Sequence, residues 1–219
     1  MAIEGLKGSG KTILVNRLEV FLKENNVVFS VIRLTKKGNE NSFIEKIYNE
    51  YSCLKRKSFS RAIIYAYRAY IASKNTNWDS QLILGDRSII TSYTTRWRKW
   101  FNSPYISVLF VNITEPFMRA PDVVIFLQVS MENLEQRIRK RNSIDIDSSL
   151  ERLHEMNNAY REISTSKIIK RLRHVKWVYV DGNQNEDAVY DEICRIISCF
   201  STSVTTPSQS APDGTFSNS

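Results

Sequence analysis

The sequence predicts an α/β domain in which helices cover both faces of a parallel sheet. Short apolar runs alternate with helix-like segments along the chain, and a glycine-rich motif of the phosphate-binding type stands near its start. The chain has 219 residues, of which 42% are hydrophobic and 25% are charged. This length and this composition are ordinary for one globular domain with a well-buried core. We therefore expect a single domain over residues 1–200.

The predicted strands are short runs of β-branched and apolar residues. They cover residues 27–33, 81–85, 123–129 and 175–180, and helix-like segments separate them. Residues 1–4 precede the glycine-rich motif, so the strand that leads into it is predicted to be unusually short. Runs of this kind are typical of strands that are buried on both sides in a parallel sheet.

Several helices carry start signals. Ser148 and Glu151 form a predicted capping box, in which each side chain bonds a free backbone N–H group, before an apolar pattern that reaches Ile163. Ser130 precedes a second helix over residues 131–141. The apolar pattern over residues 189–200 predicts a C-terminal helix. Residues 201–219 are rich in Ser, Thr and Pro and are predicted to form a disordered tail.

The spacing Gly5-x4-Gly10-Lys11-Thr12 matches a phosphate-binding loop. Glycines let backbone N–H groups surround phosphate oxygens, and the helix that follows directs the positive end of its dipole at them. In this interpretation Lys11 neutralises the β- and γ-phosphates of ATP, and Thr12 is a ligand of Mg2+. The predicted nucleotide-binding residues of this loop are Gly5, Gly8, Ser9, Gly10, Lys11, Thr12 and Ile13.

The predicted strand over residues 81–85 leads directly into Asp86 and Arg87. A signalling GTPase needs an Asn-Lys-x-Asp motif to read its base, and the sequence has none. An ATPase motor usually carries an acidic pair at this strand end. Asp86 and Arg87 instead suit phosphoryl transfer, in which the carboxylate manages Mg2+ or the nucleophile and the guanidinium clamps a phosphate of the acceptor.

Three arginines, Arg137, Arg139 and Arg141, precede a polar stretch, and we interpret residues 137–149 as a lid. Phosphoryl transfer spreads negative charge over the equatorial oxygens, so arginines on a closing segment can stabilise that charge and exclude water. A solvated basic helix face is the alternative interpretation of the same run.

Together these residues resemble the thymidylate kinase family of P-loop nucleoside monophosphate kinases. Ile3-Glu4-Gly5 is similar to the start of the family's phosphate loop, and Asp86-Arg87 to the pair after its third strand. Pro121-Asp122, the lid arginines and the segment over residues 180–184 match further motifs in the right order. The resemblance implies a three-layer P-loop kinase fold with five parallel strands and a homodimer. It also implies transfer of the ATP γ-phosphoryl group to a 5′-monophosphate such as dTMP, with Mg2+.

The resemblance also assigns roles to individual residues. The residues near the adenine would be Arg137, Asn183 and Gln184. Those at the transferring phosphoryl group would be Lys11, Asp86, Arg139 and Arg141, with Mg2+ at Thr12 and Asp86. Those at the acceptor would be Lys7, Ile64, Arg68, Arg87, Ser92 and Arg96.

The sequence departs from the family's pattern on the acceptor side. Ile64 stands where the family has an aromatic residue that stacks on thymine, and Arg96 stands where it has Gln. Lys7 stands where the family commonly has an aspartate that accepts a hydrogen bond from the acceptor's 3′-hydroxyl, and an ammonium group has donors only. We hypothesise that the acceptor bears an anionic or acceptor-rich group near Lys7. The alternative is that Lys7 faces solvent or pairs with an acid.

Charge and cysteine content leave other readings open. The net charge of +8 favours an anionic partner, and the basic and aromatic run over residues 96–100 suits either nucleic acid or a buried or dimer-forming face. Cys53, Cys194 and Cys199 lack metal-ligand spacing and are expected to be reduced core thiols of a cytoplasmic protein. No apolar run is long enough to span a membrane. The functional alternatives are a deoxynucleoside or small-metabolite kinase of the same fold, and a nucleotide-binding regulator without transfer activity.

Overall fold

The computed structural model describes residues 1–34, 42–51, 53–54, 57–99, 101–140 and 149–202. These residues form a five-stranded parallel sheet with the strand order β2-β3-β1-β4-β5. The strands are β1 (Ala2–Gly5), β2 (Phe29–Arg33), β3 (Leu82–Asp86), β4 (Val123–Gln128) and β5 (Lys176–Asp181). The predicted parallel α/β fold with five strands is therefore confirmed.

The short strand β1 lies at the centre of the sheet. It pairs with β3 on one side and with β4 on the other, and Ile3 stands opposite both Asp86 and Ile125. All four residues of β1 are buried. Because parallel strands end at the same edge of a sheet, this register brings Gly5 and Asp86 to one edge. The two motifs singled out in the sequence therefore meet there.

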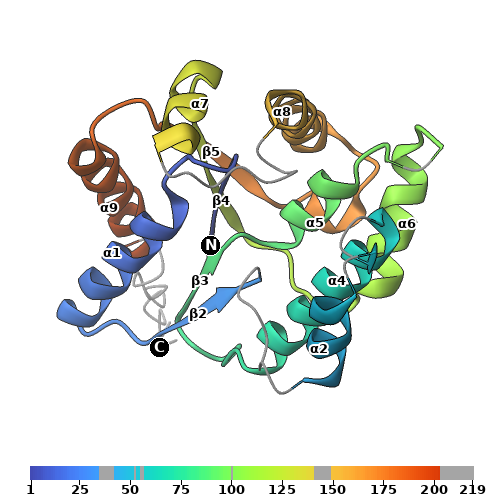
Figure 1. Ribbon diagram of the computed structural model, residues 1–219. Coiled ribbons are helices and arrows are strands. Elements are labelled where there is room, and N and C mark those ends of the chain that lie inside the picture. Colours follow the sequence, from blue (N-terminus) through green and yellow to red (C-terminus); the bar gives the residue numbers. More distant parts are fainter. Residues whose placement is uncertain (35–41, 52, 55–56, 100, 141–148, 203–219) are drawn as a thin grey trace, which may run out of the picture.

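Helices cover both faces of the sheet (Figure 1). On one face lie α1 (Lys11–Glu24) and α9 (Glu186–Thr202), whose Leu18, Leu22 and Ile193 are buried against the strands. On the other face lie α2 (Phe43–Glu50), α4 (Ser58–Lys74), α5 (Ile89–Arg96), α6 (Pro104–Thr114) and α8 (Leu150–Thr165). The helix α7 (Met131–Lys140) lies above β4 and β5 in Figure 1, and a 3-10 turn over Lys170–Leu172 precedes β5.

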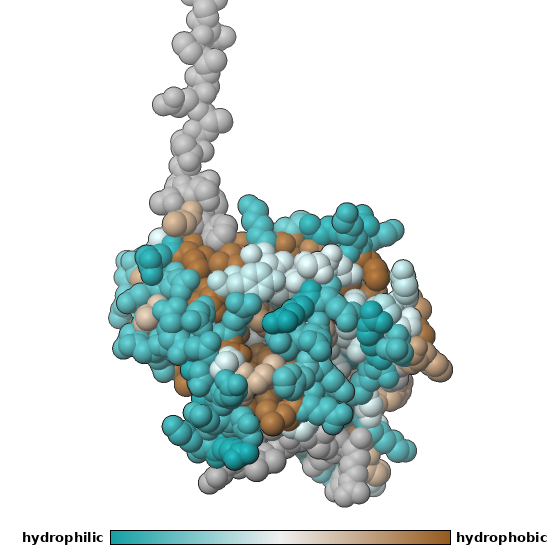
Figure 2. Space-filling model, turned by 90° about the horizontal axis from the view of Figure 1, so that it is seen from above, coloured by the Kyte–Doolittle hydropathy of each residue, from teal (hydrophilic) through white to brown (hydrophobic). Residues whose placement is uncertain are grey.

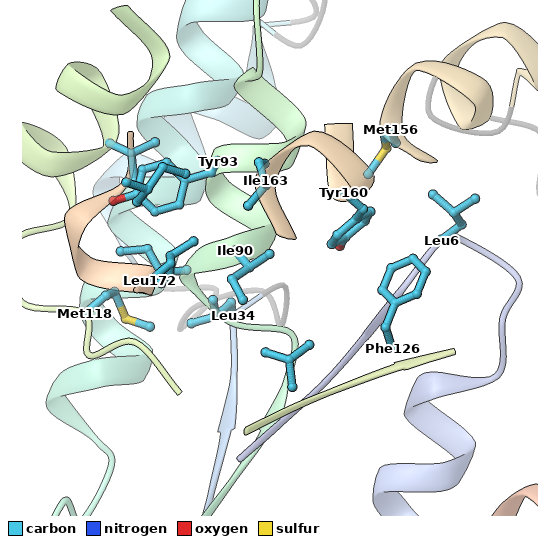
Figure 3. Close-up of a cluster of buried hydrophobic side chains, with 14 of the residues drawn as sticks. Leu6, Leu34, Ile90, Tyr93, Met118, Phe126, Met156, Tyr160, Ile163 and Leu172 are labelled. Carbon is cyan, nitrogen blue, oxygen red and sulfur yellow. The ribbon is translucent and has the colours of Figure 1, made fainter. Parts of the chain in front are cut away.

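The larger core lies between the sheet and the helices α5 and α8 (Figure 3). Phe126 of β4 packs against Tyr160 of α8 with ring centroids 4.8 Å apart. Leu6 and Met156 lie beside these two rings. This packing fixes α8 relative to the end of β1, where the phosphate-binding motif begins.

Some predicted boundaries were wrong. Ser149, and not Ser148, caps α8, because the Ser149 Oγ accepts a hydrogen bond of 3.2 Å from the backbone N–H of Arg152. Two adjacent serines give the same sequence signal, so the pattern did not resolve them. The helix α9 extends to Thr202, whereas the apolar pattern ends at residue 200. The predicted tail beyond residue 202 lies outside the described residues.

The prediction of core thiols was wrong for two cysteines. Cys53 and Cys199 are exposed, and Cys194 is partly buried. The buried stripe of α9 contains Val189, Ile193 and Ile197, and Cys199 falls outside this i, i+4, i+8 spacing. In the described part of the chain, no helix combines the length and the apolar character that a membrane span requires.

Candidate active site

The phosphate-binding loop connects β1 to α1 and is tightly packed. Gly10 caps α1 with a φ of 92°, in the left-handed region that favours glycine. A Cβ atom on Gly5 would lie 2.9 Å from the Ser9 Oγ and 3.0 Å from the carbonyl oxygen of Leu127. A side chain at either position would therefore disturb the loop, which explains why the motif needs these glycines.

Lys11 begins α1, and its ammonium group is held over the loop. Its Nζ donates hydrogen bonds of 2.6 Å to the carbonyl oxygen of Leu6 and 3.1 Å to the Ser9 Oγ. The residue is buried. Both acceptors belong to the loop, so the ammonium group lies where a phosphate held by the loop would meet it.

Thr12 and Asp86 meet at the junction of α1 and β3. The Thr12 Oγ1 donates a hydrogen bond of 3.0 Å to the Asp86 Oδ2. A hydroxyl and a carboxylate oxygen suit Mg2+, which in such sites also binds water and substrate phosphates. Across the described ranges, no group of three or more His, Cys, Asp and Glu side chains could hold a metal. A cation at Thr12 and Asp86 would therefore share its coordination with a bound nucleotide.

A small cationic hollow of about 140 Å³ opens beside the loop. Its lining includes Lys7, Lys11, Thr12 and Arg87. Three of these four side chains carry a positive charge, so the hollow suits phosphate oxygens. Lys7 comes from the loop and Arg87 from the turn after β3, and the structure brings these two predicted acceptor residues to the same hollow.

A second pocket, of about 240 Å³, shares the loop residues Gly8 and Gly10 with this hollow. Arg137 of α7 lines it and donates a hydrogen bond of 3.0 Å to the carbonyl oxygen of Gly182, after β5. The predicted nucleotide-binding residues in its lining are Gly8, Ser9, Gly10, Ile13, Arg137 and Gln184. The structure thus gathers residues from the loop, α7 and the segment after β5 around one pocket.

Asn183 was predicted beside the adenine, but its side chain forms hydrogen bonds with the segments that follow β4 and end β5. Its Oδ1 accepts hydrogen bonds of 2.9 Å from the backbone N–H of Ser130 and from the Asn133 Nδ2. Its own Nδ2 donates to the Asp181 Oδ1 at 2.8 Å. Asn183 therefore joins the ends of β4 and β5 and does not line the pocket that contains Gln184.

The arginines of the predicted lid divide into two situations. Arg137 reaches the pocket, whereas the side chain of Arg139 is 75% exposed and pairs with Glu135 one turn earlier in α7. Arg141 and residues 142–148 of the predicted lid lie outside the described residues.

Hydrophilic residues predominate on the face above the strand ends, with hydrophobic patches between them (Figure 2).

Arg68, predicted to contact the acceptor base, is paired with a carboxylate from a neighbouring helix. Its Nε and Nη2 donate hydrogen bonds of 2.7 and 2.8 Å to the two oxygens of Glu45 in α2. The two side chains are 10% and 2% exposed. This bidentate pair fixes the guanidinium plane of Arg68 against α2.

Ser92 and Arg96, also predicted at the acceptor, are joined to Glu115 at the end of α6. The Ser92 Oγ donates a hydrogen bond of 2.7 Å to the Glu115 Oε2, and the Arg96 Nη1 lies 3.1 Å from its Oε1. Burial raises the pKa of Glu115, and the charge of Arg96 acts against that increase. All three residues are buried, as is Ile64 of α4. These predicted residues therefore lie in the protein interior, and none of them lines either of the two pockets described above.

The basic and aromatic run over residues 96–100 is only partly packed onto the protein where it is described, since Arg96 is buried and Trp97 is half-buried, whereas Arg98 and Lys99 are exposed. The Trp97 Nε1 and the Arg98 Nε donate hydrogen bonds of 2.8 and 3.0 Å to one oxygen of Glu162. These bonds lower the pKa of Glu162, with that from Trp97 as the largest cause. Because Arg96 is buried and Trp97 is held by Glu162, this arrangement favours the packed interpretation of the run over the nucleic-acid interpretation.

Residues 1–200 match a family model described as deoxynucleoside kinase. The chain belongs to the deoxynucleoside kinase family. The match spans the predicted domain, both pockets and every predicted site residue. A search of curated proteins gave no match.

Deoxynucleoside kinases are P-loop kinases related to thymidylate kinases but distinct from them. The resemblance to thymidylate kinases therefore predicted the P-loop kinase fold and a kinase activity. The deoxynucleoside kinase family, to which the chain belongs, was one of the alternatives given in the sequence analysis. The departures at Lys7, Ile64 and Arg96 all fall at positions that the resemblance to thymidylate kinases had assigned to the acceptor.

Three buried carboxylates hold residues of the candidate site or of the turn beside it, and none of the three was itself predicted as a functional residue. Glu45 holds Arg68, Glu115 holds Ser92 and Arg96, and Glu4 accepts hydrogen bonds from the turn after Arg87. A glutamate with a partner 23 residues away looks the same in sequence as a glutamate exposed to solvent. For Glu4 a signal existed, since it stands within the apolar run of β1.

Proposed function

We propose that this deoxynucleoside kinase family member transfers the γ-phosphoryl group of ATP to the 5′-hydroxyl of a deoxynucleoside. The contact between Thr12 and Asp86 carries the proposal, because it brings the helix after the phosphate loop and the end of β3 within hydrogen-bond distance. In the reaction the bond from the γ-phosphorus to its bridging oxygen breaks, and a bond to the acceptor oxygen forms. ADP leaves, and the hydroxyl proton is released.

The donor nucleotide is proposed to lie along the loop. The backbone N–H groups of the loop and Lys11 would neutralise the β- and γ-phosphates. Arg137 and Gln184 would border the base, since both line the pocket beside the loop. Mg2+, held by Thr12, Asp86 and the phosphates, would supply positive charge against the negative charge of the transferring group. Arg139 and Arg141 are proposed to reach that group from the lid.

The acceptor is proposed to lie between the turn after β3 and α4. Arg87 lines the cationic hollow, where an acceptor oxygen would approach the γ-phosphate. Arg68 engages Glu45 through Nε and Nη2, so Nη1 is the donor that we propose for the acceptor base. Ile64, Ser92 and Arg96 would support this region from within the protein. Asp86 is proposed either to hold Mg2+ or to take the proton of the acceptor hydroxyl.

A second candidate is transfer to a nucleoside 5′-monophosphate, the thymidylate kinase reaction. It is favoured by one observation: Lys7 and Arg87 share the hollow with Lys11. An acceptor phosphate brings charge of its own, and two cations beyond Lys11 would bind it. A phosphate oxygen also needs no general base, whereas a 5′-hydroxyl must lose its proton.

The discriminating experiment is an ATP and Mg2+ coupled assay across deoxynucleosides, ribonucleosides and their 5′-monophosphates. Highest turnover of a deoxynucleoside supports the first candidate, and highest turnover of dTMP or another monophosphate supports the second. Binding of ATP without turnover of any acceptor would contradict both and favour a regulatory protein. Asp86→Asn serves as the control for transfer that depends on this site.

Lys7 gives a second, independent comparison. Lys7→Met should raise the KM for a monophosphate about tenfold or more if the acceptor phosphate binds in the cationic hollow. The same substitution should leave the KM for a deoxynucleoside within about threefold. Lys23→Met, at an exposed position in the last turn of α1, is the matched control. An unchanged ranking of acceptors in the Lys7 variant would remove the argument for a monophosphate.

We also propose that the chain forms a homodimer through α6. Tyr105, Leu109 and Ile113 follow each other at intervals of four residues and are 66%, 59% and 68% exposed. Side chains at this spacing share one helix face. An apolar face of this kind on a soluble domain is typical of a protein interface.

A further inference from the structure

Glu4 is a buried carboxylate to which the transfer reaction assigns no role. It belongs to β1, directly before Gly5, and is 0% exposed. Burying a carboxylate is costly unless hydrogen bonds replace its water. The partners of Glu4 therefore indicate which part of the molecule it holds.

Each oxygen of Glu4 accepts two hydrogen bonds. The Oε1 accepts from the backbone N–H of Ser88 at 2.7 Å and from the Ser88 Oγ at 2.8 Å. The Oε2 accepts from the Thr91 Oγ1 at 2.7 Å and from the Tyr160 hydroxyl at 2.8 Å. Ser88 caps α5, Thr91 lies in its first turn and Tyr160 belongs to α8. One side chain of β1 thus joins α5 and α8.

The bonds to Ser88 hold the turn that carries Arg87. Arg87 has a φ of 72°, a left-handed conformation that is uncommon for a residue with a side chain. Such a conformation costs about 1 to 3 kcal/mol and persists where the surroundings hold it. The Arg87 N–H donates to the carbonyl oxygen of Ile3 at 3.2 Å, and the next N–H donates to Glu4. Two consecutive residues of β1 therefore fix this turn, which directs Arg87 into the cationic hollow.

The hydrogen bond from Tyr160 connects Glu4 of β1 to the helix α8. The Tyr160 ring packs on Phe126, with Leu6 and Met156 nearby (Figure 3). Its hydroxyl donates to Glu4 at 2.8 Å. Burial raises the pKa of Tyr160, so the hydroxyl stays protonated and can donate. The positive charge of Arg87 lowers the pKa of the same hydroxyl, but by less than burial raises it. Through these hydrogen bonds Glu4 joins the turn after Arg87 to Tyr160 of α8.

We propose that Glu4 is a positioning residue for Arg87, holding the turn after β3 in its left-handed conformation and tying that turn to α8 through Tyr160. Glu4 does not contact substrate in this proposal and acts through the placement of Arg87. The kinetic test rests on the proposed transfer function, whereas a binding test with an inorganic anion does not.

The kinetic test is a double-mutant cycle between Glu4 and Arg87. Glu4→Gln keeps the shape of the side chain but replaces one accepting oxygen with a donor. We expect kcat to fall about 10- to 100-fold, with the KM for ATP changed less than about threefold. In an Arg87→Ala background, Glu4→Gln should lower kcat by no more than about threefold further. If Glu4→Gln lowers kcat by the same factor in the Arg87→Ala background as in the unaltered protein, the proposal is overturned.

The binding test measures the affinity of inorganic tripolyphosphate by calorimetry in the same four proteins. Arg87→Ala and Glu4→Gln should each weaken binding about three- to tenfold, and the double variant should bind no more weakly than the weaker single variant. Affinity unchanged by either single substitution would overturn the proposal. Absence of transfer in the unaltered chain would refute the proposed function alone, and this cycle would still decide the role of Glu4.

A matched pair of tyrosines separates positioning from general loosening of the core. Tyr160→Phe removes one donor to Glu4, and Tyr93→Phe removes a hydroxyl that bonds Asn112 at 2.6 Å from an equally buried ring. We expect kcat to fall about three- to tenfold in the first variant and to stay within about twofold in the second. Equal losses in both would contradict the proposal. This pair also keeps the test possible if thermal unfolding shows that Glu4→Gln does not fold.

Discussion

Thr12 and Asp86 are joined by a hydrogen bond of 3.0 Å that connects the first turn of α1 to the end of β3. The central place of β1 makes the contact possible, because β1 pairs with β3 and leads through the loop into α1. The two oxygens thus come from motifs that are far apart in the sequence. In the proposed reaction, this junction would bring the donor phosphates close to the acceptor.

Asp86→Asn should lower kcat by about 100-fold or more. The amide keeps the shape and one accepting oxygen, but it loses the charge that would hold Mg2+ or take the hydroxyl proton. Steady-state kinetics at saturating ATP measures the effect, and binding of ATP without Mg2+ should change less than about threefold. Asp79→Asn, at an exposed position before β3, is the control. A loss of less than about threefold in the Asp86 variant would contradict the proposed role.

Arg137 and Arg139 should affect different kinetic constants. Arg137 lines the pocket beside the loop, so Arg137→Ala should raise the KM for ATP about tenfold with a smaller change in kcat. Arg139 is exposed and is proposed to act from the lid, so Arg139→Ala should lower kcat with little change in that KM. Substitution by alanine is tolerated in α7 because alanine favours helix. The same pattern of changes in both variants would contradict the assignment.

The geometry of the phosphate-binding loop was more predictable from sequence than the surroundings of the residues proposed for the acceptor. The phosphate loop is a continuous segment, and its backbone needs glycine at fixed positions such as Gly5 and Gly10. Those requirements leave a pattern that can be recognised without a structure. The parallel fold was predictable for a related reason, since buried strands are hydrophobic along their length.

The residues proposed for the acceptor are held by contacts between helices that are distant in the sequence. Arg68 is held by Glu45 from α2, and Ser92 is held by Glu115 at the end of α6. No periodicity or spacing marks a glutamate for such a partner, because the choice is made by helix packing. The same limit applies to Glu4, whose partners come from α5 and α8.

The buried pair of Arg96 and Glu115 gives a prediction for stability. Glu115→Ala leaves the Arg96 guanidinium and the Ser92 hydroxyl without the oxygens that they share in the interior, which should cost about 3 to 5 kcal/mol in the free energy of unfolding. Chemical denaturation measures this cost. Glu162→Ala, at a pair with Arg98 that is about half exposed, should cost no more than about 1 kcal/mol. Similar costs for the two substitutions would contradict the interior role of Glu115.

Glu115 also predicts a pH dependence of stability. Burial raises its pKa in the folded protein above the ordinary value of 4.5. The folded state then holds the proton more tightly than the unfolded state, so the contribution of Glu115 is complete below pH 4.5 and is lost as the pH rises through the raised pKa. Denaturation as a function of pH should show this decline, and Glu115→Gln should reduce it. An identical profile in both proteins would contradict the shift.

The exposed face of α6 predicts the oligomeric state. Leu109 lies between Tyr105 and Ile113 on that face, so Leu109→Glu would place a charge in the proposed interface. Size-exclusion chromatography with light scattering should give a dimer for the unaltered chain and a monomer for Leu109→Glu at micromolar concentration. Val20→Glu, at a position on α1 that is 54% exposed, should remain dimeric. A monomeric unaltered chain, or a dimer that survives Leu109→Glu, would exclude α6 as the interface.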